Sequence, residues 1–156
     1  MEDLNLVNTG EIMVHLEEIN PNNWRLGLKV AKEQEKFVSS DFRMLARAYA
    51  FREYRSKAFV IYNDEIPVGM AMYYDWPEVE AYDFSQLFID ERYQGEGYGY
   101  LAAYQIINMM KSDGKFSKVI LCYIEGNESA KKMYEKLGFY HTGENDGDEI
   151  IMQMDF

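Results

Sequence analysis

The chain has a single cysteine, Cys122, and two histidines, His15 and His141. One cysteine excludes a disulfide within the chain, and because Cys122 lies in an apolar run it is more typical of a core thiol than of a nucleophile. The histidines are far apart in the sequence, and each is more typical of an ordinary strand or surface position than of a ligand or catalytic base. The sequence therefore predicts neither a disulfide-linked domain nor a metal site.

Long apolar runs, internal repeats and low-complexity tracts are also absent. No run approaches the roughly eighteen residues that a membrane helix needs. Residues 1–10 are acidic and polar rather than basic and then apolar, so they do not resemble a secretory signal. We therefore expect no membrane partner and a cytoplasmic location.

Basic residues are few, because 16 Lys and Arg stand against 27 Asp and Glu and give a net charge of −11 at pH 7. Binding to nucleic acid depends on clustered Lys and Arg, so this charge argues against a nucleic-acid partner. An acidic surface attracts cations, but it also simply keeps a protein soluble. The placement of the acids has to decide between these two interpretations.

The 156 residues, 47% of them apolar, suit one domain covering residues 1–156, with 1–10 as a poorly patterned N-terminal extension. Apolar spacing predicts an α/β (α+β) fold with the order β-α-α-β-β-β-α-β-α-β-β. Strands are expected at 12–19, 58–62, 68–74, 81–89, 119–124, 139–143 and 149–154, and helices at 21–36, 41–50, 98–110 and 130–137. The exposed edges of such a sheet would permit a homodimer.

Three glycines fall within five residues in the stretch 94–99, between an apolar run and an amphipathic helix. Glycine lets the backbone adopt positive φ, and the start of the helix adds free N–H groups and the positive end of its dipole. The turn is therefore suited to bind phosphate or pyrophosphate. Its spacing, Gln94-x-x-Gly97-x-Gly99, fits neither the dinucleotide fingerprint nor the P-loop.

This spacing resembles the acyl-CoA signature Q/R-x-x-G-x-G/A of the GNAT N-acetyltransferases, and it follows a central strand as in that family. A second segment, Asn127-x-x-Ala130-x-x-x-Tyr134-x-x-x-Gly138-Phe139, resembles the family's N-x-x-A-x-x-x-Y-x-x-x-G-F. The element order is also that of the GNAT fold, a mixed, mostly antiparallel seven-stranded sheet flanked by about four helices. The resemblance covers nearly the whole chain from residue 12 onward and implies an acetyl-CoA-dependent N-acetyltransferase.

The resemblance implies a site for coenzyme A. The pyrophosphate is expected on the N–H groups of the glycine turn and the pantetheine between the strands at 81–89 and 119–124, where backbone amides polarise the thioester carbonyl. The expected cofactor-binding residues are Leu87, Phe88, Ile89, Gln94, Gly95, Glu96, Gly97, Tyr98, Gly99, Asn127, Ala130 and Tyr134. Glu96 departs from the family, in which Lys or Arg is common, and its charge weakens binding unless it points to water. Asn127 is equally suited to cap the helix that follows it.

Catalytic roles also follow from the resemblance. Tyr134 matches the tyrosine that protonates the departing thiolate, although its place on an apolar helix face also suits a core aromatic. Asp83 falls where several family members carry a catalytic glutamate, and Ser85, on the same strand face, falls where polyamine-specific relatives often carry one. Because Ser85 cannot act as a base, Asp83 is the expected base with Glu80 as substitute. An ordinary solvated acid is the alternative.

Acidic residues crowd two segments that line the acceptor groove in this family. The expected acceptor residues are Glu33, Glu35, Asp41, Asp75, Glu78 and Ser85. An acid-lined groove selects a cation, and the segments 22–25 and 33–38 resemble those of bacterial spermine/spermidine acetyltransferases. These points favour a polyamine acceptor. The alternatives are another amine, such as a protein N-terminus, an amino acid or an aminoglycoside, or a non-catalytic acyl-CoA-binding module.

Overall fold

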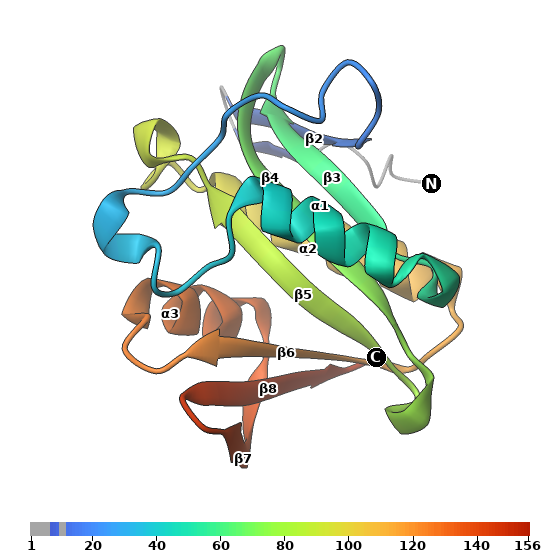
Figure 1. Cartoon of the computed structure of the whole chain (residues 1–156). Helices are drawn as coiled ribbons and strands as arrows, with labels where there is room; N and C mark the ends of the chain where they lie inside the picture. Colours follow the sequence, from blue (N-terminus) through green and yellow to red (C-terminus); the bar gives the residue numbers. More distant parts are fainter. Residues whose placement is uncertain (1–6, 10–11) are drawn as a thin grey trace.

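The computed structural model describes residues 7–9 and 12–156, which build an eight-stranded sheet with the order β1-β2-β3-β4-β5-β6-β8-β7 (Figure 1). The strands are β1 (Val7–Thr9), β2 (Ile12–Glu18), β3 (Lys57–Asn63), β4 (Ile66–Trp76), β5 (Ala81–Ile89), β6 (Lys118–Ile124), β7 (Tyr140–Asp146) and β8 (Glu149–Asp155). The helices of this part of the chain are α1 (Asp41–Ala50), α2 (Tyr98–Asp113) and α3 (Glu128–Leu137), with 3-10 turns η1 (Lys32–Gln34), η2 (Arg52–Tyr54), η3 (Pro77–Val79) and η4 (Glu91–Tyr93). Neighbouring strands are antiparallel except for β5 and β6.

All seven predicted strands are present. The structure adds β1, a short edge strand in a region that was predicted to lack a pattern, and pairs it with the start of β2. The helices predicted at 41–50, 98–110 and 130–137 are also present. Over the described residues, the helices are too short or too polar to cross a membrane.

The helix predicted at 21–36 is wrong, because turns occupy residues 21–25 and only η1 is helical. Gly27 has a φ of +71°, which interrupts a right-handed helix. The Asn20 N–H donates to Asn23 Oδ1 at 2.7 Å, so a side chain takes over a backbone hydrogen bond and favours a turn. Trp24, an apolar residue of the segment predicted as a helix, is 43% exposed. Local turn chemistry therefore outweighed a helical spacing of apolar residues.

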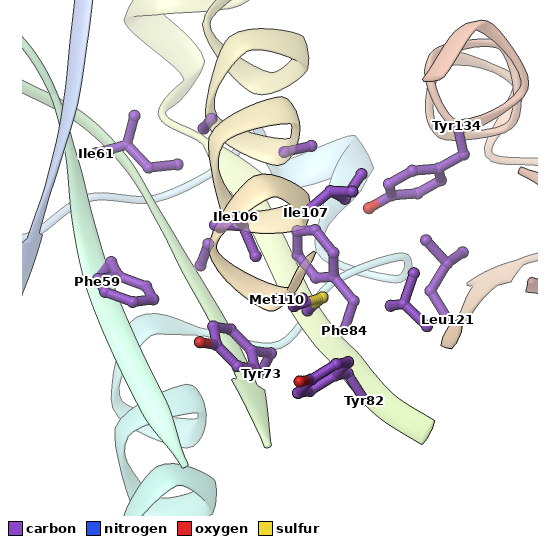
Figure 2. Packing of buried hydrophobic residues seen from close by; sticks show 14 of the residues in the cluster. Phe59, Ile61, Tyr73, Tyr82, Phe84, Ile106, Ile107, Met110, Leu121 and Tyr134 are labelled. Carbon is purple, nitrogen blue, oxygen red and sulfur yellow. The ribbon is translucent and has the colours of Figure 1, made fainter. Parts of the chain in front are cut away.

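The sheet separates two hydrophobic clusters, one on each face. Phe59 and Ile61 of β3 pack with residues of α2 such as Ile106, whereas Val60 between them packs with Met44 of α1. Figure 2 shows the α2 side, where aromatic residues of β3, β4 and β5 gather around the helix. Burying one such side chain contributes about 1.5–3 kcal/mol. The alternation of side chains along β3 and its neighbours thus holds α1 and α2 on opposite faces (Figure 1).

The parallel strands β5 and β6 are paired only near their beginnings, where Tyr82 lies beside Val119 and Asp83 beside Ile120. Further along, β5 remains paired with β4 as far as Ile89, while β6 remains paired with β8. The two strands therefore separate, and the backbone of residues 87–89 has no strand partner on the β6 side. This opening between the strands positions the candidate site.

Candidate functional site

The turn between η4 and α2 presents backbone N–H groups to a groove. Gly95 and Gly97 have φ values of +80° and +89°. A Cβ added at either position would meet nothing within 4 Å, so the backbone angle rather than lack of space requires glycine. The first turn of α2 carries no acidic residue, and its leading N–H groups have no partner within the helix. This geometry suits a bound anion.

The groove beside this turn, which we name the turn groove, has a volume of about 400 Å³. It is lined by residues 87–89, by most of the turn and by residues along α3 from Ser129 to Lys136. Lys132 and Lys136 of α3 also line it, and the Lys136 Nζ lies 4.5 Å from the centroid of the Tyr100 ring. Sequence reasoning missed these lysines, although their i, i+4 spacing after Asn127 is a signal that could have found them.

Gln94 holds the turn against η1. Its Nε2 donates to the Ile89 carbonyl oxygen at 2.9 Å and to Gln34 Oε1 at 2.8 Å, and Gln34 Nε2 donates back to Gln94 Oε1 at 2.9 Å. This reciprocal pair joins the turn to the segment 30–38, whose residue Phe37 also lines the turn groove. Gln94 therefore positions the groove as well as lining it.

The turn groove fits coenzyme A. Free N–H groups at the turn suit a pyrophosphate, and two lysines suit further phosphates. The strand edge at 87–89, which has no strand partner on the β6 side, suits the amides of a pantetheine arm. The predicted cofactor residues that line it are Leu87, Phe88, Ile89, Gln94, Gly95, Gly97, Tyr98, Gly99, Asn127, Ala130 and Tyr134. Glu96 is exposed and does not line the groove, so its charge lies where water screens it best. Asn127 also caps α3, because its Oδ1 accepts from the Ala130 N–H at 3.3 Å.

A second groove, which we name the α1 groove, has a volume of about 550 Å³ and is lined by residues of α1, β5, β6 and α3. The residues that line both grooves are Phe37, Val38, Leu87, Asn127, Ala130 and Tyr134. Tyr134 projects from α3 toward the sheet, and its ring meets that of Phe84 edge-on at 6.4 Å (Figure 2). Burial raises the pKa of Tyr134 well above its ordinary value. Its hydroxyl is therefore protonated at neutral pH and able to donate.

Asp83 lies in the α1 groove, where β5 pairs it with Tyr74 of β4. Burial raises the pKa of Asp83 to about 6, and the charge of Glu149 acts in the same direction, whereas a hydrogen bond from Tyr74 and the charge of Arg47 oppose it. A carboxyl group with this pKa is ionised at neutral pH and can accept a proton. Glu149, at the start of β8, also lines the groove and was missed by sequence reasoning.

Cys122 lines the α1 groove and is exposed, so the prediction of a core thiol is corrected. The side chains of β6 alternate, and Leu121 rather than Cys122 points into the hydrophobic core. Desolvation within the groove raises the pKa of the Cys122 thiol to about 11. The thiol is therefore protonated at neutral pH and is not an activated nucleophile.

Two arginines of α1, Arg43 and Arg47, lie one helical turn apart and both line the α1 groove. The Arg47 Nη1 donates to Ser85 Oγ at 3.0 Å. Ser85 is the position at which the family resemblance suggested a carboxylate, and here it contacts a guanidinium group instead. With Lys36, the groove has three cationic side chains beside the carboxylates of Glu35, Asp83 and Glu149. Sequence reasoning counted only acids here, although the i, i+4 arginines of the predicted helix were visible.

The structure distributes the predicted acceptor residues over several places. Glu35 and Ser85 line the α1 groove, and Asp41 lines an adjoining cavity of about 360 Å³. Asp75 is only 3% exposed and accepts hydrogen bonds from Arg55 Nε and Lys115 Nζ, both at 2.7 Å, so it serves a structural ion-pair network. Two predicted acceptor residues, Glu33 and Glu78, are exposed and line neither groove, and the same holds for Glu80, the predicted substitute for Asp83 as base. Glu78 and Glu80 lie before β5 begins, beyond the paired end of the sheet.

Comparison with known proteins agrees with this geometry. Residues 17–139 match the model of the Acetyltransferase (GNAT) family. A spermine/spermidine N(1)-acetyltransferase of Bacillus subtilis (strain 168) is 29% identical over 136 residues, which are 82% of this chain and 88% of that protein. A spermidine N-acetyltransferase from Vibrio cholerae, solved with CoA and spermine, superposes with a TM-score of 0.74 at 15% identity, covering 91% of this chain and 95% of that one.

An aminoglycoside acetyltransferase solved with coenzyme A gives a TM-score of 0.75, also at 15% identity, over 91% of this chain and 94% of that one. At these identities the two solved structures show a shared fold. They confirm the predicted fold, and they differ from each other in the acceptor that their names give. Likeness of fold alone therefore does not select the acceptor.

Proposed function

Because the chain belongs to the Acetyltransferase (GNAT) family, we propose that it transfers the acetyl group of acetyl-CoA to a primary amine of a polyamine. The observation that carries the proposal is the meeting of the turn groove and the α1 groove at Tyr134, with Asp83 nearby in the α1 groove. One groove suits the donor and the other suits an amine. Tyr134, the proton donor, lies where they join, and Asp83, the proton acceptor, lines the α1 groove.

Acetyl-CoA supplies an acetyl group activated as a thioester, so the transfer forms a C–N bond to the acceptor and breaks the C–S bond. The N–H groups of the glycine turn, with Lys132 and Lys136, hold phosphate groups in the turn groove. The edge of residues 87–89 that faces β6, where no strand pairs with it, binds and orients the amide arm. With the donor bound in this way, its thioester would lie beside Tyr134, which lines the same groove.

Asp83 accepts the proton that the amine must lose before or during attack, and its pKa of about 6 leaves it ionised for this task at neutral pH. Tyr134 donates its phenolic proton to the departing sulfur. Desolvation disfavours the phenolate, so Tyr134 is protonated at neutral pH and is a weaker acid than a phenol in water. The two groups thus have complementary roles.

A polyamine is supported as acceptor by the name of the Bacillus relative and by the carboxylates of the α1 groove. The carboxylates that line this groove are those of Glu35, Asp83 and Glu149. Several carboxylates spaced along a groove suit a chain with several ammonium groups, whereas each exposed pair alone contributes only about 0.2–1 kcal/mol. Asp75, expected from the sequence to contact the acceptor, is buried in its ion-pair network and is not required for this binding.

The test is acetyl-CoA-dependent release of free CoA with spermine, spermidine, putrescine, lysine, an aminoglycoside and a short peptide amine. Saturable turnover with the highest kcat/KM for spermine or spermidine would support the proposal. Turnover restricted to the other amines would support an N-acetyltransferase but would exclude a polyamine as its acceptor. Binding of acetyl-CoA without turnover of any amine would instead favour a non-catalytic acyl-CoA-binding module.

A further inference from the structure

The α1 groove is divided by charge. Asp83 and Glu149 are contributed by the sheet, whereas Arg43 and Arg47 are contributed by α1, which covers that face of the sheet (Figure 1). Lys36 adds a third cation, so the groove contains as many cationic as anionic side chains. A polyamine bound between the carboxylates would leave the α1 wall without an anionic partner.

The groove arginines differ from two other arginines of the protein. Arg55 pairs with Asp75 and Asp113, and Arg92 pairs with Asp90, at N–O distances of 2.7–2.9 Å. In the described residues, by contrast, no ion pair includes Arg43 or Arg47. The protein has a net charge of −11. Two such guanidinium groups one turn apart in a groove are therefore suited to bind an anionic ligand.

Arg47 is also held in place for binding. It is partly buried, and its Nη1 donates to Ser85 Oγ at 3.0 Å, which uses one of its five N–H groups. The remaining donors are in the planar arrangement that matches the two oxygens of a carboxylate. Arg43, one turn earlier, adds a second positive charge to the same wall.

We infer that Arg47, assisted by Arg43, binds a carboxylate of the acceptor while Asp83 and Glu149 face the amine that is acetylated. The inference rests on the acetyl transfer proposed above and extends its acceptor class to amines that carry a carboxylate, such as diamino acids. The bonds formed and broken are those of the transfer itself. Asp83 receives the amine proton, and Tyr134 provides the proton to sulfur.

Two pairs of amines separate the effect of a carboxylate from that of the amine chain. Lysine is cadaverine with one added carboxylate, and ornithine is putrescine with one added carboxylate. The experiment compares kcat/KM within each pair at saturating acetyl-CoA for the wild type, Arg47→Gln and Arg47→Lys. Arg52→Gln is the matched control, because Arg52 follows α1 but lines neither groove.

We expect the wild type to prefer lysine over cadaverine and ornithine over putrescine. Arg47→Gln should reduce both preferences by about tenfold, the size of a lost charge-assisted hydrogen bond, with an intermediate value for Arg47→Lys. Arg52→Gln should leave both preferences unchanged. A wild type that prefers the plain diamines, or a preference that Arg47→Gln leaves intact, would overturn the anionic subsite without affecting acetyl transfer to polyamines.

A binding measurement separates this inference from the proposed function. Calorimetric titration of the CoA-loaded protein with lysine and with cadaverine needs no turnover. Suppose that no amine is acetylated, but that lysine binds more tightly than cadaverine and Arg47→Gln removes this difference. This result would support the carboxylate subsite and contradict the proposed reaction. Equal affinities for the two amines in wild type and Arg47→Gln would remove the subsite. Thermal unfolding of each variant checks that the fold is retained.

Discussion

The two grooves are built in different ways. The turn groove depends on the backbone of consecutive residues, 94–99, and on a strand edge left free where β5 and β6 separate. The α1 groove depends on side chains that α1, four strands and α3 bring together from distant parts of the sequence. The difference indicates that donor binding is encoded locally, whereas acceptor selection arises only in the tertiary structure.

Tyr134 belongs to both grooves, and its removal should have the largest effect. Tyr134→Phe keeps the ring that packs on Phe84 but removes the proton donor, so kcat should fall at least about a hundredfold while the affinity for CoA stays the same. Steady-state rates and calorimetry measure the two quantities. Tyr104→Phe, at an exposed position of α2, serves as control. An unchanged kcat in Tyr134→Phe would leave Tyr134 as a packing residue only.

Asp83 belongs to the α1 groove alone, so its loss should affect the reaction and not the binding of CoA. In Asp83→Asn, kcat/KM should fall about ten- to a hundredfold. The wild-type profile should rise with pH through about 6, as Asp83 ionises, and this limb should disappear in the variant. A pH profile with the same limb in both proteins would exclude Asp83 as the base.

The same substitution should stabilise the protein. Burial raises the pKa of Asp83 from 3.8 to about 6, so between these pH values the folded state binds more protons than the unfolded state. Stability therefore falls as pH rises through this range. Asp83→Asn should increase the free energy of unfolding at pH 7.5 by up to about 3 kcal/mol and change it little at pH 3.5. Urea unfolding at both pH values measures the difference.

These differences also explain what the sequence could predict. The glycine turn and the strand before it were predictable because they are contiguous. Seven strands were also predictable, because alternating or continuous apolar residues mark strands in the sequence. The helix at 21–36 was not, because Gly27 and the hydrogen bond between Asn20 and Asn23 act locally against an apolar spacing. Arg47 beside Ser85 was also not predictable, since the two residues are 38 positions apart and belong to different elements.

Substitution of Gly97 tests whether CoA binding in the turn groove depends on the backbone conformation of the turn. Alanine at a φ of +89° costs about 1–2 kcal/mol, so Gly97→Ala should shift the turn and weaken CoA binding by about tenfold, with little change in kcat at saturation. Gly143→Ala is a close control, because Gly143 has a φ of +86°, equally open space and a position in β7. Similar losses of CoA affinity in both variants would indicate a general loss of stability rather than a local effect.

The smallest effect should come from the side chains of the turn groove. Lys132→Gln removes one cation from the groove wall, and an exposed contact of this kind contributes about 0.2–1 kcal/mol. The dissociation constant of CoA should therefore rise about two- to fivefold at low salt, with a smaller rise at high salt because the charges are screened. Lys131→Gln is the matched control, since the neighbouring Lys131 does not line the groove. If the two variants bind CoA equally well, phosphate binding depends on the backbone of the turn alone. The turn groove would then bind its ligand through the backbone, whereas the α1 groove binds its ligand through side chains.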